Sequence, residues 1–137
     1  MAVSWVVDEA ISPLARRILV AEEILIAPEL LLAEAANAVW KNFQAANIDR
    51  RQAEAAIEVL PQFFSALFPL QPLAGPALAL ANDLKRPVYD CFYLALAEAE
   101  EARLVTDDKR LLKAVKDSNL ADRVIALDKW NDAKSTR

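Results

Sequence analysis

Short apolar runs alternate with longer helical stretches along most of this chain, and this alternation constrains its fold more than any other feature. Runs of four or five apolar residues are typical of buried strands, and the segments between them are long enough to form helices. The pattern therefore predicts an α/β fold of three layers, α/β/α, in which helices cover both faces of a central parallel sheet. The expected strands are Glu23–Ala27, Phe68–Pro72, Arg103–Thr106 and Val124–Leu127.

Capping residues and prolines indicate where the intervening helices begin and end. Ser12 precedes Pro13 in the order that opens a helix, and Asp49 has Gln52 three residues later, which is the spacing of a capping box. Pro87 disfavours helical backbone at Arg86 and so separates two helices there. The expected helices are 12–21, 28–47, one that begins after Asp49, Pro76–Lys85, Val88–Glu101 and Asp108–Ser118.

The chain has 137 residues, the size of one domain, and shows no internal repeat or long linker. We expect a single domain over residues 1–127 and a polar tail over 128–137. Residues 59–82 carry no charge over a length that could cross a bilayer, but four prolines and one glycine interrupt them. The first residues include Asp8 and Glu9 and do not resemble a signal peptide. We therefore expect a soluble, cytoplasmic protein.

Composition excludes several kinds of catalytic site. The chain has no histidine, one cysteine (Cys91) and one glycine (Gly75), so His-based triads, His- or thiolate-bound zinc and glycine-rich phosphate loops are excluded. The net charge of −4 is unlike that of a generally basic nucleic-acid-binding protein. Cations do occur in local pairs, which are either solvated helix ends or a basic rim around a site. Carboxylates remain as the main chemical groups.

Three acidic positions are unusual because they lie within or beside apolar runs. Glu34 shares one helix face with Asn37 and Lys41, which is either an exposed polar stripe or the edge of a site. Asp90 lies in a first helical turn among large apolar residues, where the helix dipole also favours an anion. Asp107 and Asp108 follow an expected strand, and one of them is enough to cap the next helix.

The carboxyl ends of parallel strands meet at one edge of a sheet, where ligands commonly bind. We expect Glu34, Asp90 and Asp108 to converge there, and converging carboxylates repel one another unless a cation lies between them. An all-oxygen site favours Mg²⁺ or Mn²⁺. Such an ion supports hydrolysis of phosphodiesters, which is the activity that these residues suggest.

Three segments of the chain resemble the successive signatures of PIN-domain proteins, especially the VapC-type toxins of bacterial toxin–antitoxin pairs. They are IAPELLLAEAANAVWK, PVYDCFYLALAE and LVTDDKRLL, and the resemblance extends from about Ser4 to Leu127. It implies an endoribonuclease that depends on Mg²⁺ or Mn²⁺, is often a homodimer, and is held inactive by a cognate antitoxin.

The resemblance also implies roles for individual residues. The family's helix glutamate and nearby asparagine match Glu34 and Asn37, and its tyrosine–aspartate pair matches Tyr89 and Asp90. Its threonine–any–aspartate motif matches Thr106 and Asp108, which leaves Asp107 as a variable position and a possible helper. The RNA backbone is expected to contact three cations: Lys41, Lys109 and Arg110.

One family feature is not evident. PIN domains usually begin with an apolar strand that ends in an aspartate, whereas AVSWVVDEA resembles the segment after that strand. We therefore expect the central strand and its aspartate to be missing, because of a misassigned start or because the chain is a shortened, inactive relative. A third interpretation, ranked lowest on spacing, is that Ser4–Val7 forms the first strand and Asp8 replaces the aspartate.

The sequence thus predicts a ribonuclease toxin with Glu34, Asp90 and Asp108 as metal ligands and with Asn37 and Thr106 as supporting residues. The main alternative is a catalytically inactive PIN-like module that binds an antitoxin or a second copy of itself. A structure-specific DNA nuclease on the same fold is a further alternative.

Overall fold

The computed structural model describes residues 4–7 and 24–130, so the helix expected at 12–21 and the position of Asp8 lie outside the described residues. The described strands form one sheet in the order β3-β2-β1-β4-β5, and all neighbouring strands are parallel. The predicted α/β fold with a parallel sheet is therefore confirmed. The strands are β1 (Ser4–Val7), β2 (Ile24–Pro28), β3 (Ala66–Phe68), β4 (Arg103–Thr106) and β5 (Val124–Ala126).

The sequence-based prediction of a missing central strand is wrong. β1 occupies the middle of the sheet, between β2 and β4, where Ser4 pairs with Ile24 and Val7 with Val105. The family-based spacing suggested that this segment follows the first strand, but its three large apolar residues are good strand formers and the neighbouring strands provide ladders on both sides. Ser4–Val7 as the first strand, the interpretation ranked lowest, is the one that the structure bears out.

The described helices agree with the prediction except near the prolines. α4 begins at Gln71, earlier than expected, because Pro72 occupies the first turn, where a helix needs no backbone donor. The predicted strand at Phe68–Pro72 is accordingly displaced, and β3 ends at Phe68. The helices are α2 (Leu30–Gln44), α3 (Arg50–Val59), α4 (Gln71–Leu84), α5 (Val88–Ala99) and α6 (Lys109–Val115), with 3-10 turns η1 (Leu60–Phe63) and η2 (Ala121–Arg123).

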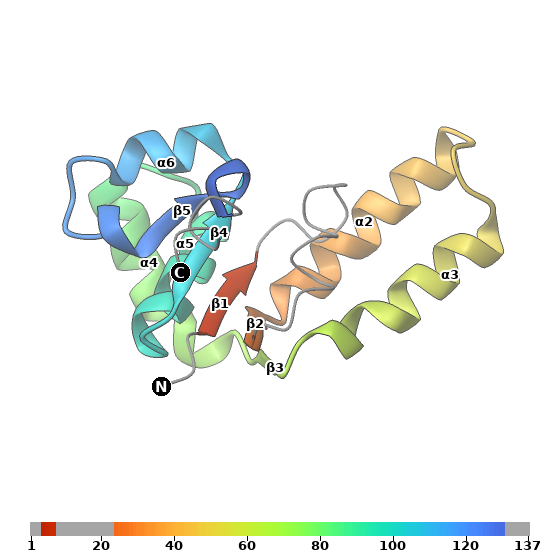
Figure 1. The fold of residues 1–137 in the computed structure, drawn as a ribbon, viewed down its shortest axis with the longest axis horizontal. Helices are drawn as coiled ribbons and strands as arrows, with labels where there is room; N and C mark the ends of the chain where they lie inside the picture. Colours follow the sequence, from red (N-terminus) through yellow and green to blue (C-terminus); the bar gives the residue numbers. More distant parts are fainter. Residues whose placement is uncertain (1–3, 8–23, 131–137) are drawn as a thin grey trace.

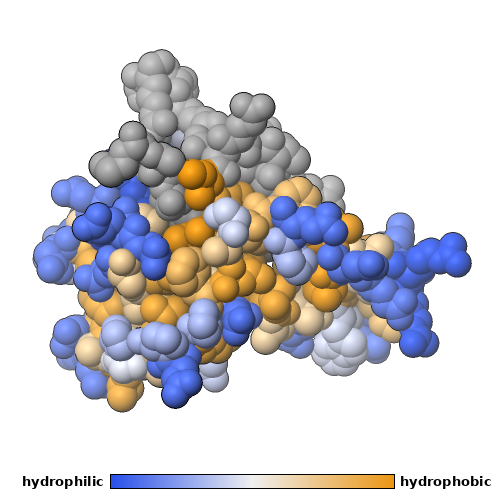
Figure 2. Space-filling model, turned by 90° about the horizontal axis from the view of Figure 1, so that it is seen from below, coloured by the Kyte–Doolittle hydropathy of each residue, from blue (hydrophilic) through white to orange (hydrophobic). Residues whose placement is uncertain are grey.

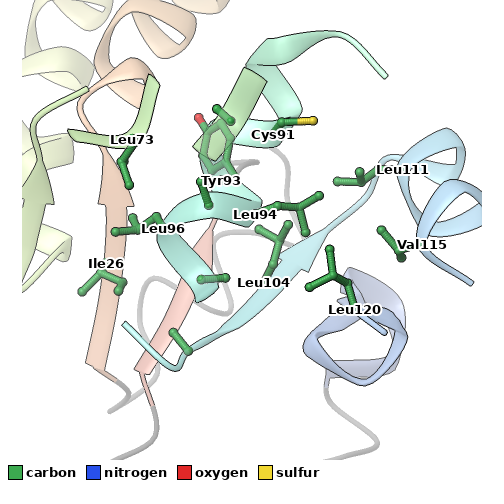
Figure 3. Close-up of a cluster of buried hydrophobic side chains, with 14 residues drawn as sticks. Ile26, Leu73, Cys91, Tyr93, Leu94, Leu96, Leu104, Leu111, Val115 and Leu120 are labelled. Atoms are coloured by element: carbon green, nitrogen blue, oxygen red, sulfur yellow. The ribbon is translucent and has the colours of Figure 1, made fainter. Parts of the chain in front are cut away.

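Strand residues alternate between two cores, one on each face of the sheet. Ile26 and Leu104 belong to a core formed with α4, α5 and α6 (Figure 3), whereas their neighbours Leu25 and Val105 belong to a second core on the opposite face. α5 is the most buried helix, and its buried residues are Cys91, Tyr93, Leu94, Ala95, Leu96 and Ala97. The second core includes Trp130, so it continues beyond residue 127, the expected end of the domain.

α2 and α3 pack side by side and extend away from the sheet (Figure 1). The predicted capping box is present at the start of α3: the Asp49 side chain accepts from the Gln52 N–H, and Gln52 accepts from the Asp49 N–H. Viewed from below, apolar residues gather in the middle of the molecule between two hydrophilic ends (Figure 2).

A membrane-spanning helix is not found among the described residues. Within residues 24–130, no helix is long and apolar enough to cross a membrane.

Candidate functional site

A tight turn between α4 and α5 determines where Arg86 lies. Lys85 adopts a left-handed conformation with φ of 54°, which ends α4, and Pro87 immediately precedes α5. The Arg86 N–H donates to the Ala81 carbonyl at 3.3 Å and so keeps the turn close to α4. Arg86 therefore lies in this turn, four residues before Asp90 of α5.

Arg86 joins two of the carboxylates that the sequence singled out. Its Nη2 lies 2.8 Å from Asp90 Oδ2 and 3.5 Å from Asp108 Oδ2. The three side chains are largely shielded from solvent, with exposed fractions of 17% for Arg86, 24% for Asp90 and 34% for Asp108. Carboxylates from α5 and from the start of α6 thus converge on a single cationic nitrogen.

Asp108 is held in place by the end of β4 and the start of α6. Its backbone N–H donates to Thr106 Oγ1 at 3.0 Å, and Thr106 is a fully buried residue at the carboxyl end of β4. Asp108 Oδ1 accepts from the N–H groups of Arg110 at 2.9 Å and Leu111 at 3.3 Å. Asp108 is therefore the helix cap, while its second oxygen faces Arg86.

Glu34, in the second turn of α2, reaches the same region through Tyr93. The hydroxyl of Tyr93, whose ring is buried in α5, donates a hydrogen bond to Glu34 Oε1. Much of the Glu34 side chain contacts solvent, but partial burial of its carboxyl group raises the pKa. The Tyr93 hydrogen bond opposes this rise, and the negative charge of Asp90 adds to it. Glu34 is thus close enough to Asp90 to be affected by its charge.

These residues suit a hard divalent cation by their chemistry. Among residues 24–130, however, no three carboxylates are already close enough together to hold a metal ion. The observation in favour of such a site is that Asp90 and Asp108 already share one cationic partner, with all-oxygen ligands. Glu34 lies nearby, and Asp8 follows β1 in the sequence but is outside the described residues.

The remaining predicted residues lie around these carboxylates, and one of them, Arg110, donates its backbone N–H to Asp108. Asn37 and Lys41 are exposed on the same helix as Glu34, one and two turns further along. Lys109 and Arg110 are exposed in the first turn of α6, beside Asp108. Asp107 is exposed, and the described cations form no ion pair with it.

Sequence reasoning missed the two residues that connect the site. In the sequence, Arg86 marks only a helix boundary, and Tyr93 is only one of the large apolar residues that surround Asp90. A signal was present for Tyr93 alone, because it lies three residues after Asp90 on the same side of the expected helix Val88–Glu101. This spacing does not reveal the partners of Arg86 and Tyr93 on α6 and α2.

Comparison with known proteins agrees with this architecture. Residues 2–117 match the model of the PIN domain family, and the chain belongs to that family. Within the family it is of the VapC type: it is 33% identical over 104 residues to Ribonuclease VapC1 of Mycobacterium tuberculosis, in both the CDC 1551 / Oshkosh and H37Rv strains. The aligned region covers 75% of this chain and 77% of each relative.

A solved structure supports the fold independently. The crystal structure of PAE2754 from Pyrobaculum aerophilum superposes with a TM-score of 0.75 at 23% sequence identity. The superposition covers 99% of this chain and 91% of that one. The family match and the 33% identical relatives confirm the family resemblance inferred from the three sequence motifs.

Proposed function

We propose that this protein is an endoribonuclease that depends on Mg²⁺ or Mn²⁺ and acts as the toxin of a toxin–antitoxin pair. The observation that carries the proposal is the convergence of Asp90 and Asp108 on one nitrogen of Arg86. Membership of the PIN domain family and similarity to a protein named Ribonuclease VapC1 support RNA as the substrate.

In this proposal Glu34, Asp90 and Asp108 hold the ion, directly or through water. Asp8 is a further candidate ligand, because it follows β1 in the sequence and β1 is the parallel neighbour of β4. A bound ion would lower the pKa of a coordinated water and stabilise charge on the phosphodiester. Asp107, adjacent to Asp108, is a possible helper.

Neighbouring residues orient the ligands and contact the substrate. Thr106 fixes the backbone of Asp108 through its hydroxyl oxygen, and Tyr93 holds one oxygen of Glu34. Asn37 is placed one turn from Glu34, where its amide can hydrogen-bond a phosphate or a ligand. Phosphates of the RNA would be contacted by exposed cations near the carboxylates: Lys41, Lys109 and Arg110.

The proposal includes a cognate antitoxin, a homodimer and a cytoplasmic location. Large apolar side chains on the surface support protein–protein contacts, because monomeric proteins rarely expose many of them together. Trp40 is 54% exposed and Phe43 is 38% exposed, both on the part of α2 that extends from the sheet. Light scattering on the purified chain, alone and with its antitoxin, would test the dimer and the complex.

Replacement of a proposed ligand tests the activity. Asp90→Asn is expected to reduce Mn²⁺-dependent RNA cleavage by at least about a hundredfold, because the amide cannot replace a metal-binding carboxylate. The measurement is cleavage of end-labelled single-stranded RNA with Mn²⁺ or EDTA. Asp117→Asn, which removes an exposed aspartate after α6, is the matched control and is expected to retain activity. Unchanged cleavage by Asp90→Asn, with circular dichroism like that of the parent protein, would contradict the proposal.

The inactive interaction module is the second candidate. The observation that favours it is that a cation of the chain itself, Arg86, lies between Asp90 and Asp108. Calorimetric titration of the full chain with Mn²⁺ separates the candidates: the nuclease binds Mn²⁺ and cleaves RNA, whereas the inactive module does neither. Matched RNA and DNA substrates in the cleavage assay would identify the DNA nuclease alternative.

A further inference from the structure

Arg86 lies between the two carboxylates that are proposed as metal ligands. Acidic groups that converge without a positive charge between them repel one another. Here the chain provides that charge itself, since Nη2 of Arg86 lies within 2.8 Å of Asp90 and 3.5 Å of Asp108. The Arg86 side chain is the most shielded of the three, with 17% exposed. Its placement therefore relieves the repulsion between Asp90 and Asp108.

A divalent ion bound by Asp90 and Asp108 would lie close to the positive charge of Arg86. Arg86 contacts Oδ2 of both aspartates through a single nitrogen, so its charge lies where a bridging ion would be attracted. A second positive charge close to the guanidinium would be strongly repelled, because partly shielded charges interact more strongly than charges in bulk water. Arg86 therefore opposes the binding of a divalent ion by Asp90 and Asp108, and its withdrawal would favour that binding.

Two ion pairs hold the Arg86 side chain in place, but not all of its N–H groups have a hydrogen-bond partner. Its Nε is buried and has no hydrogen-bond partner among the described residues. A buried donor without a hydrogen bond is unfavourable, so movement of the Arg86 side chain toward water would let Nε form one. The same movement would break the two ion pairs. These opposing effects make displacement by a divalent ion feasible.

We infer that Arg86 is a resident counter-cation that competes with the divalent metal for Asp90 and Asp108. Without metal it keeps the two carboxylates together, and it lowers the affinity of the site for the ion. Arg86 is thus a positioning residue for the carboxylates. The inference rests on the proposed function, because it assumes that the two carboxylates are metal ligands.

Metal binding measured without RNA provides the test. Calorimetric titration with Mn²⁺ is performed on the parent protein and on Arg86→Gln, which removes the charge but keeps a polar side chain. Arg86→Gln is expected to bind Mn²⁺ about tenfold more tightly. Arg86→Lys retains the charge on a shorter side chain that holds the two carboxylates less closely, so its Mn²⁺ affinity is expected to lie between those of the other two proteins.

The chain contains a matched control for the loss of one positive charge. Arg50 also pairs with a carboxylate four residues later, Glu54, at 2.9 Å, but that pair is exposed on α3. Arg50→Gln is therefore expected to leave the Mn²⁺ affinity unchanged. In thermal unfolding, Arg86→Gln is expected to be less stable than the parent protein in EDTA and to gain more stability from Mn²⁺.

The outcomes separate this inference from the proposed function. Tighter Mn²⁺ binding by Arg86→Gln supports the inference, and so does binding by that variant when the parent protein binds none. Equal or weaker binding, with a parent protein that does bind, overturns the inference and leaves the proposed function intact. If Arg86→Gln does not fold, Arg86→Lys decides by the same criterion. If none of these proteins binds Mn²⁺ and the parent protein cleaves no RNA, both the inference and the proposed function are wrong.

Discussion

At the scale of single residues, the site depends on side chains that have more than one partner. Asp108 caps α6 with one oxygen and faces Arg86 with the other. Tyr93 buries its ring in the core while its hydroxyl reaches Glu34, as expected for an aromatic residue with a polar end. Such residues combine a structural role with a role at the site. Their substitution therefore changes stability together with any activity, and measurements of both are required.

Cys91 provides a prediction at this scale because its side chain is buried in the core. The Cys91 side chain is fully buried, next to Asp90 in the sequence. Burial raises the pKa of the thiol to about 11, and the negative charge of Asp90 adds a smaller effect. At about pH 8, only about one thiol in a thousand is then ionised. Native protein is expected to react with a thiol reagent far more slowly than urea-unfolded protein, as measured by absorbance.

The control for this prediction moves the thiol to an exposed position. The double variant Cys91→Ala/Ala99→Cys places it at the exposed end of α5 and is expected to react rapidly while folded. Because the folded state holds the Cys91 proton more tightly than the unfolded state, this group contributes stability below about pH 9, and the contribution is lost as the pH rises toward 11. Rapid labelling of native Cys91 would contradict the packing of α5.

At the scale of elements, the sequence was most informative where local signals suffice. β4 was predicted with its observed bounds, and the capping box at Asp49 is formed by two residues three positions apart. Local signals failed where the structure of a segment depends on its contacts with segments remote in sequence. β1 is a short segment whose central position depends on pairing with β2 and β4, and these pairs are remote in sequence. Pro72 indicated a break but lies in the first turn of a helix, where proline is compatible.

α3 provides a prediction at this scale, because it has no buried residue and so depends on its cap. Asp49→Ala removes the side-chain acceptor of the Gln52 N–H and is expected to cost about 1 kcal/mol. We expect amide hydrogen exchange to accelerate roughly fivefold across 50–59 while the amides of α5 remain protected. Glu58→Ala, at an exposed position of the same helix, is the control. Equal acceleration in α5 would show that α3 unfolds only with the whole molecule.

At the scale of the whole molecule, the sequence predicted that carboxylates converge but not what lies between them. Parallel strands bring their carboxyl ends to one edge, which was sufficient to expect Asp90 and Asp108 near each other. The position of Arg86 depends on the close packing of α4 against α5 and on the left-handed residue Lys85, which no local pattern indicated. The folded molecule thus neutralises its acidic edge with a cation of its own.

Net charge leads to the last prediction. A protein with a net charge of −4 repels RNA overall, so binding must rely on local cations. If Lys41, Lys109 and Arg110 each contact one phosphate, log K should fall against log salt with a slope of about −2, since each contact to single-stranded nucleic acid contributes about −0.7. Fluorescence anisotropy of labelled RNA, with Asp90→Asn as the non-cleaving background, measures this slope.

Two triple variants test which cations are responsible. Glutamine at Lys41, Lys109 and Arg110 should bring the slope close to zero. Glutamine at Arg50, Lys113 and Lys116, which removes equal charge elsewhere, should leave the slope near −2. If both triple variants reduce the slope equally, RNA binding reflects overall charge and the assignment of these three cations is wrong.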